Sequence, residues 1–233
     1  NNAAKWRFMF GGQRGVPLTV RMILGRGWGQ GPTHSQNLQA WFAHVPGLKV
    51  IEPTTPYDAK GMLLAALEQN DPVLIFEHKL LYKMKGHVPE GHYTVPIGPS
   101  ETRRQGKDVT IVATAIMVAR ALEAAVILEG ENIDVEVIDL RTLRPMDTES
   151  IIASVKRTSR LLCVYEGVKT LGIGAEISAA IVESDAFGFL DAPVIRLGGQ
   201  ECPIPYSPGL ERASVPQVDD IVRCARDLVR RKI

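Results

Sequence analysis

The chain has 233 residues, 45% hydrophobic and 23% charged, an ordinary globular composition that excludes disordered, collagen-like and low-complexity proteins. Lysine and arginine number 27 against 26 aspartate and glutamate residues, so no overall field favours nucleic acid or an anionic membrane as partner. Cys163, Cys202 and Cys224 form no CxxC pair, which favours a reducing compartment over a disulfide framework or a zinc site. No apolar run approaches the roughly 18 residues of a membrane span. We expect a cytoplasmic, bacterial protein.

The first residues indicate a fragment. The chain begins Asn1-Asn2 without a methionine, and a targeting signal would lie in the part that precedes it. An organellar location therefore stays open.

The first 80 residues alternate between strand and helix patterns. A strand over 16–22 leads into a loop with glycines at positions 25, 27, 29 and 31. Thr33-His34-Ser35-Gln36 then has the spacing of a capping box, and the helix that it would open carries an apolar face. A strand over 48–51, a helix from Thr55-Pro56 to about Asn70 and a strand over 73–76 follow.

The second half repeats this alternation after a stretch rich in proline and glycine over 80–105. We predict, in chain order, a strand over 108–114, a helix over 116–129, a strand over 133–140, a helix over 148–156, a strand over 160–165, a helix over 174–184, a strand over 193–197 and a closing helix from about 215. Such alternation indicates an α/β fold with parallel sheets covered by helices. We divide it into units 1–80 and 106–233, joined by a linker over 81–105.

The glycine-rich loop is the strongest local indication of a site. It lies between the end of a strand and the start of a predicted helix, where open α/β sheets bind ligands. His34 would stand in the first helical turn, where the helix dipole disfavours the imidazolium, so we expect it to be neutral near pH 7 and able to exchange a proton. A capping or packing histidine is the alternative.

Long stretches of the chain resemble the β subunit of the thiamine-diphosphate-dependent component of 2-oxo acid dehydrogenases, the pyruvate, branched-chain and acetoin class. The stretches include GPTHSQNLQAWFAHVPGLKVIEPTTPYDAKGML, DPVLIFEHKLLY, VEVIDLRTLRPMD and LDAPVIRLGG. The resemblance implies a truncated pyrimidine-binding domain followed by a transketolase-type C-terminal domain. It also implies decarboxylation of a small 2-oxo acid and acyl transfer to a lipoyl group.

The same resemblance assigns parts of the active site. His34 matches the histidine that lies near the reactive thiazolium and handles protons during acyl transfer. The glutamate that activates the cofactor's pyrimidine lies upstream of Asn1 in the family pattern, and the Mg²⁺ and diphosphate are held mainly by an α subunit. The implied partners are that α subunit, in an α2β2 assembly, and the peripheral subunit-binding domain of a dihydrolipoyl acyltransferase.

A structural potassium site is a further family feature. It corresponds to residues near the first strand and the end of the second predicted helix: Leu18, Ala66, Leu67, Gln69 and Asp71. Last-turn carbonyls lack intrahelical partners and carry partial negative charge. An ordinary helix end is the alternative, and Gln69 stands where some relatives have an acid.

Three other functions stay open from the sequence. The chain could be an acetoin-cleaving homologue, a non-catalytic assembly or docking fragment of the complex, or a fragment of a transketolase or deoxyxylulose-phosphate synthase, whose motifs GPTH also resembles. VEVIDLRTLRPMD and LDAPVIRLGG favour the dehydrogenase pattern over the last of these.

Overall fold

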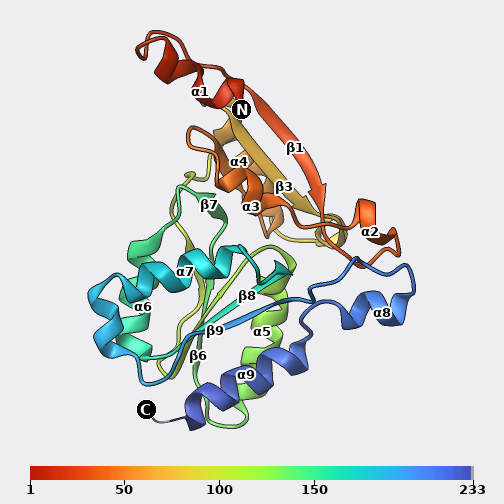
Figure 1. Cartoon of the computed structure of the whole chain (residues 1–233), viewed down its shortest axis with the longest axis vertical. Coiled ribbons are helices and arrows are strands. Elements are labelled where there is room, and N and C mark those ends of the chain that lie inside the picture. The colour runs from red at the N-terminus through yellow and green to blue at the C-terminus, as the bar shows by residue number, and fades with distance from the viewer. Residues whose placement is uncertain (232–233) are drawn as a thin grey trace.

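Two β-sheets organise the chain in the computed structural model (Figure 1), which describes residues 1–231. Residues 232 and 233, at the end of the predicted second unit, lie outside the described residues. The strands are β1 (Thr19–Leu24), β2 (Lys49–Ile51), β3 (Val73–His78), β4 (Glu101–Arg104), β5 (Val109–Ala113), β6 (Val135–Asp139), β7 (Thr142–Arg144), β8 (Leu161–Val168) and β9 (Ile195–Gly199). The helices are α1 (Asn2–Met9), α2 (Gly31–His34), α3 (Gln39–Ala43), α4 (Pro56–Leu67), α5 (Ile116–Glu129), α6 (Thr148–Thr158), α7 (Ile173–Val182), α8 (Pro208–Ala213) and α9 (Val218–Arg230), with 3₁₀ turns η1 (Lys79–Lys83) and η2 (Asp185–Phe189).

Both sheets are mostly parallel, and each carries one antiparallel edge strand. The first sheet has the order β1-β3-β2-β7 and the second the order β4-β6-β5-β8-β9. β7 runs antiparallel to β2, and β4 runs antiparallel to β6. The prediction of an α/β fold with parallel sheets is therefore confirmed, and each sheet adds one short antiparallel strand at its edge.

The two antiparallel strands also cross the predicted unit boundary. β4 comes from the predicted linker and joins the second sheet, whereas β7 follows β6 in the chain and joins the first sheet. Each is only three or four residues long, too short for a periodic pattern to reveal. The division at residues 81–105 stays a prediction.

Several element boundaries follow from local chemistry. The Thr55 hydroxyl accepts a hydrogen bond from the Asp58 N–H (3.1 Å), which confirms the predicted cap of α4. β1 begins at Thr19 rather than Val16, and Pro17 just before it has no N–H to offer a ladder. α4 ends at Leu67, earlier than the predicted Asn70.

The predicted capping box at Thr33 does not open a helix. α2 ends at His34, and α3 begins only at Gln39, after an irregular stretch. Local spacing favoured a helix start here, but the His34 carbonyl accepts a hydrogen bond from the Lys79 ammonium (2.6 Å). A helix continuing through His34 would have used that carbonyl for its own ladder.

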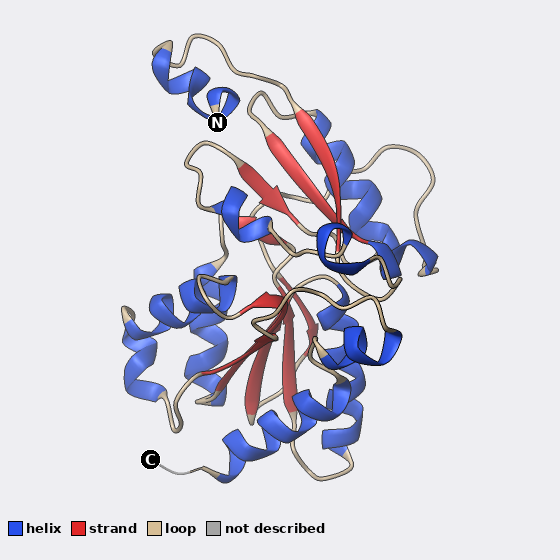
Figure 2. Cartoon of the chain, turned by 45° about the vertical axis from the view of Figure 1, so that its right-hand side comes forward, coloured by secondary structure: helices blue, strands red, loops and turns tan. Residues whose placement is uncertain are grey.

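Helices cover the second sheet on both faces (Figure 2). α5 and α9 pack with one set of alternating strand residues, among them Ile111 and Val137, and α6 and α7 pack with the other set, which includes Val112 and Ile138. This alternation follows from the two-residue period of a strand.

One hydrophobic cluster continues from the first sheet into the second. It contains Val50, Leu74 and Phe76 from the first sheet together with Val112 and Tyr165 from the second. On the other face of the first sheet, α4 covers a separate cluster that includes Ile51 and Ile75. The two units therefore share buried apolar surface, which stabilises their arrangement.

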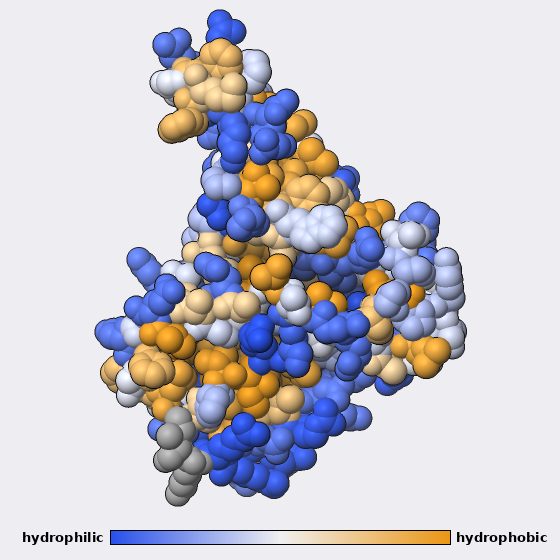
Figure 3. Space-filling model, viewed as in Figure 1, coloured by the Kyte–Doolittle hydropathy of each residue, from blue (hydrophilic) through white to orange (hydrophobic). Residues whose placement is uncertain are grey.

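The outer surface carries apolar side chains at two places. α1 lies at the upper end of the view in Figure 1, with Phe8 90% and Met9 66% exposed. Figure 3 shows apolar side chains gathered over α7 and η2, where Val182, Phe187 and Phe189 are exposed. Among the described helices, none has the length and apolarity that crossing a membrane requires.

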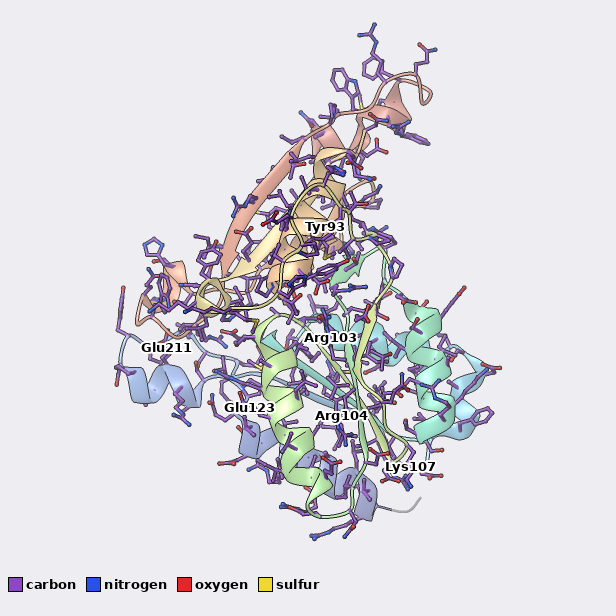
Figure 4. All side chains as sticks on the ribbon, turned by 180° about the vertical axis from the view of Figure 1, so that it is seen from behind. Tyr93, Arg103, Arg104, Lys107, Glu123 and Glu211 are labelled. Atoms are coloured by element: carbon purple, nitrogen blue, oxygen red, sulfur yellow. The ribbon has the colours of Figure 1, made fainter. Side chains whose placement is uncertain are left out.

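A buried ionic network joins the two units. Arg103, which Figure 4 places between the sheets, donates to Asp139 (2.8 Å) and to Asp58, and Arg141 donates to Asp58 (2.9 Å). Burial raises the pKa of Asp139 to about 6 against the pull of Arg103. Burial acts in the same direction on Asp58, but the Thr55 hydroxyl and the two arginines outweigh it and lower its pKa. The cross-links to Asp58 therefore tie α4 to the second half of the chain.

Candidate functional site

The glycine-rich loop leaves the first sheet at the carboxyl end of β1. Leu24 at that end pairs with His78 at the end of β3, so both strands deliver their next residues to the same edge. Gly25 has a φ of +97°, and a Cβ there would stand 2.1 Å from the His78 imidazole. Only glycine allows the loop to pass so close to this ring.

His34 lies at the end of α2, not in the first turn of a longer helix. The predicted position of His34 at the N-terminus of a longer helix is therefore wrong. The His34 side chain is exposed, while its main-chain carbonyl is held by Lys79. The residue is anchored through its backbone and presents its ring to the surroundings.

A hollow of about 650 Å³ lies beside this ring. Its apolar wall comes from β1, β3, α3 and the preceding stretch, and its polar part comes from the loop and α2. The lining residues are Met22, Ile23, Leu24, Gln30, Thr33, His34, Gln36, Leu38, Phe42 and Phe76. An apolar pocket with a few convergent polar groups is the usual form of a small-molecule site.

Lys79 is a buried cation beside the hollow. It is the first residue of η1 and only 1% exposed, and its ammonium donates to the Gln30 side chain and to the His34 carbonyl. Burial lowers its pKa, and the negative charges of Glu211 and Glu166 oppose that effect. Lys79 thus connects the end of β3 with both ends of α2.

Glu166 on β8 anchors the start of the loop from the second sheet. One carboxylate oxygen accepts from the Arg26 N–H (2.6 Å), and the other lies 2.5 Å from His78 Nε2. The Arg26 guanidinium donates to the Glu166 carbonyl (2.9 Å) and to the Ser214 carbonyl (3.2 Å). Burial lowers the pKa of Arg26, and the charge of Glu166 opposes that shift.

Glu211 on α8 anchors the middle of the loop. Its side chain accepts from the Gly27 N–H (2.9 Å) and from the Gly29 N–H (3.1 and 3.3 Å to its two oxygens). Glu211 is 4% exposed, so the carboxylate is committed to these loop amides rather than to water.

The residues assigned to a potassium site lie near one another around the end of α4. The Leu18 carbonyl accepts from the Val73 N–H (2.9 Å), and the Ala66 carbonyl accepts from the Thr19 hydroxyl and the Gln69 N–H, both at 3.2 Å. The Leu18 carbonyl thus accepts one hydrogen bond and the Ala66 carbonyl accepts two.

The side chains of this set have other partners. Gln69 accepts from the Lys49 ammonium and donates to the Ala65 carbonyl, Asp71 pairs with Arg7 at 2.6 Å, and the Leu67 side chain is exposed. The Gln69 and Asp71 side chains are thus already engaged with Lys49 and Arg7, and a cation here would compete with these partners. Within residues 1–231, no group of three or more His, Cys, Asp or Glu side chains is arranged to hold a metal ion.

Sequence reasoning predicted a role for His34 but missed the residues that hold its loop. His78 stands at the end of a buried parallel strand, a position that could have indicated a functional edge. No sequence pattern pointed to Glu166 or Glu211, because they lie 140 and 184 residues from the loop positions that they contact. His44, the C-cap residue of α3, is exposed.

Comparisons with known proteins address the family directly. The transketolase pyrimidine binding domain matches residues 1–85, and the transketolase C-terminal domain matches residues 98–221. The β subunit of acetoin:2,6-dichlorophenolindophenol oxidoreductase from Bacillus subtilis is 45% identical over 98% of this chain and 67% of its own length. The mitochondrial pyruvate dehydrogenase E1 component subunit β-2 from Oryza sativa is 48% identical over 97% of this chain and 61% of its own length.

Solved structures agree on the fold. A chain described as a split gene transketolase, inactive β4 tetramer, has a TM-score of 0.76 at 24% identity, covering 92% of this chain and 67% of that one. Transketolase from Leishmania mexicana has a TM-score of 0.62 at 20% identity, covering 89% of this chain and 30% of its own. The chain thus spans about two thirds or less of the relatives that it matches. It belongs to the E1 β-subunit family, which includes the β subunits of pyruvate dehydrogenase and acetoin oxidoreductase and combines transketolase pyrimidine-binding and C-terminal domains.

Proposed function

We propose that this chain is the catalytic β part of a thiamine-diphosphate-dependent E1 enzyme that decarboxylates a pyruvate-like 2-oxo acid and transfers the acyl group to a lipoyl arm. The observation that carries the proposal is the placement of His34. Its backbone is fixed by the buried Lys79 ammonium, while its exposed imidazole borders the apolar hollow at the carboxyl edge of the first sheet.

The hollow suits part of the proposed cofactor. Phe76, Phe42 and Met22 offer an apolar wall to a heteroaromatic ring, and Thr33 and Gln36 offer polar contacts. When bound, thiamine diphosphate supplies a carbon nucleophile that adds to a carbonyl and accepts the electron pair released on decarboxylation. Its Mg²⁺ and diphosphate would be held mainly by the α subunit, and the activating glutamate would come from a segment preceding Asn1.

His34 would act as the proton carrier of this site. Acyl transfer to a dithiolane requires a proton for the sulfur that leaves as a thiolate, and an imidazole nitrogen can donate it near neutral pH. The Lys79 ammonium holds His34 by its main-chain carbonyl, so this contact does not use either nitrogen of the imidazole ring. Apolar side chains around the hollow would limit water near the reacting groups.

The test uses the full-length β chain assembled with its α subunit. We expect His34→Ala to reduce acylation of a lipoyl domain by about 100-fold or more, since a positioned general acid contributes 10²–10⁴-fold, with assembly unchanged. His44→Ala is the matched control, because His44 is exposed and lies outside the hollow lining. Normal acylation by the His34 variant would contradict the assigned role.

Assays with the same α–β assembly also identify the substrate. Identities of 45% to the acetoin enzyme and 48% to the pyruvate enzyme do not separate the two. We expect carbon dioxide release from pyruvate or a near homologue. Cleavage of acetoin without carbon dioxide release would instead assign the chain to the acetoin branch.

The proposed partners are an α subunit, in an α2β2 assembly, and the peripheral subunit-binding domain of an acyltransferase. The relatives are named as β subunits. Exposed apolar residues on α1 and around η2, such as Phe8 and Phe187, support burial of these faces in a larger assembly. The cytoplasmic location stays a prediction, since these relatives are bacterial and mitochondrial.

A further inference from the structure

Glu211 contacts the proposed active-site loop from the opposite half of the chain. It belongs to α8, 184 residues after Gly27. Figure 4 shows it between α8 and the segment that contains α2.

The contact is specific to the loop backbone. Two alternate amides, Gly27 N–H and Gly29 N–H, converge on one carboxylate. Both glycines have positive φ, +114° and +63°, a conformation that L side chains rarely adopt. Glycine adopts this conformation without strain, so the carboxylate selects one arrangement of a flexible loop backbone.

The charges around Glu211 explain how a carboxylate can be buried here. Arg26 and Lys79 are themselves 4% and 1% exposed, and the negative charge of Glu211 raises the pKa of each against the effect of burial. Lys79 in turn binds the His34 carbonyl. Glu211 therefore holds the loop directly through its amides, and its charge favours the charged form of the Lys79 that binds the His34 carbonyl.

Packing around α8 supports the same arrangement. Tyr206 precedes α8, and its ring lies so close to Gly31 that a Cβ there would stand 2.3 Å from it. The Ser214 carbonyl at the end of α8 accepts from the Arg26 guanidinium. Both ends of α8 and its middle thus contact the loop from Arg26 to Gly31.

We propose that Glu211 is a positioning residue: it holds the glycine-rich loop and α2 from the second unit, so that His34 faces the hollow. This inference rests on the proposed role of His34. It makes α8 part of the active-site support, although no residue of α8 lines the hollow.

The first readout is independent of activity. In full-length β assembled with α, Glu211→Ala should increase amide hydrogen exchange in peptides covering residues 25–34, while peptides from α5 and β6 keep their wild-type exchange. Glu211→Gln retains an oxygen that can accept from both glycines and should restore most of the protection. Glu123→Ala is the matched control, because Glu123 is exposed on α5 (Figure 4).

The second readout is acyl transfer to the lipoyl domain. Glu211→Ala should lower this rate by about 10- to 100-fold, as expected for misplacement of a catalytic group, and Glu211→Gln should recover part of it. In the His34→Ala background, Glu211→Ala should cause no further loss, because residues acting as a unit are not additive.

The outcomes separate this inference from the proposed function. Unchanged exchange over 25–34 in Glu211→Ala, or a full additional loss in the double variant, overturns the positioning role. Normal acylation by His34→Ala overturns the proposed function instead, whatever the exchange data show. A loss of stability common to Glu211→Ala and Glu211→Gln, with equal loss of rate in both, would also contradict positioning.

Discussion

Replacing Glu52 by glutamine should change how the free energy of unfolding depends on pH. Glu52 follows β2 at the junction of the two sheets, and its side chain is fully buried, with neither carboxyl oxygen hydrogen-bonded within residues 1–231. Burial raises its pKa from the ordinary 4.5 to about 8. The nearby Thr114 side chain acts to lower the pKa of Glu52, although it makes no well-aligned hydrogen bond to the carboxyl group. The negative charges of Asp139 and Glu166 raise that pKa further.

The sign follows from proton binding in the two states. Below about pH 4.5 Glu52 is protonated in both the folded and the unfolded chain; between there and about pH 8 only the folded chain keeps the proton. The free energy of unfolding therefore falls as pH rises through this window and levels off above it. From pH 5 to pH 9, this group alone accounts for a decrease of about 4 kcal/mol, at 1.36 kcal/mol per pKa unit.

Urea unfolding measured from about pH 5 to about pH 9 tests this value by linear extrapolation. Glutamine keeps the shape of the side chain but cannot ionise. The difference between Glu52→Gln and wild type should therefore grow by about 4 kcal/mol in favour of the variant as pH rises. Asp139 also titrates in this range in both proteins, and the comparison removes most of its contribution.

Glu183→Gln is the control, because Glu183 is exposed at the end of α7, and its curve should run parallel to that of wild type. Parallel curves for wild type and Glu52→Gln would refute the reasoning. They would mean that Glu52 is ionised when folded, with water or a cation satisfying the carboxylate.

Two further predictions concern stability. Gly25→Ala should lower the free energy of unfolding by about 1 kcal/mol because of the positive φ, and by roughly 1–3 kcal/mol more because it displaces the buried His78 ring. Gly91 also has positive φ but open space around it, so Gly91→Ala should show only the first loss. Equal losses for the two variants in thermal or urea unfolding would contradict the packing argument. Arg141→Met should lower the free energy of unfolding by about 3 kcal/mol, because it leaves the buried Asp58 carboxylate with one arginine partner fewer. Lys156→Ala breaks an exposed ion pair with Asp185 and should lower it by less than about 1 kcal/mol. A similar loss in both variants would contradict the distinction between buried and exposed pairs.

The element pattern could be predicted where local chemistry and burial agree. The helix predicted over 116–129 has these bounds in the structure, because its apolar residues recur with helical spacing and its neighbours are strands buried on both faces. Thr55 caps α4 as predicted, since a hydroxyl three residues before a free N–H is a local arrangement.

The errors occur where distant groups compete with local preferences. Thr33-His34-Ser35-Gln36 has the spacing of a helix start, yet Lys79 takes the His34 carbonyl and α2 ends there. β7 was not predicted, because three residues carry no periodicity and its partner β2 lies about 90 residues earlier in the chain.

The sequence by itself determined the α/β class, the family and the histidine at the proposed site, because periodicity, capping and extended similarity are all contained in the order of residues. Only the tertiary structure decided what holds that histidine. Glu166 and Glu211 meet the glycine-rich loop across 140 and 184 residues, and Glu52 becomes a buried acid only when the two sheets close over it. Burial and long-range hydrogen bonds depend on how the sheets pack together, and no local pattern encodes that packing.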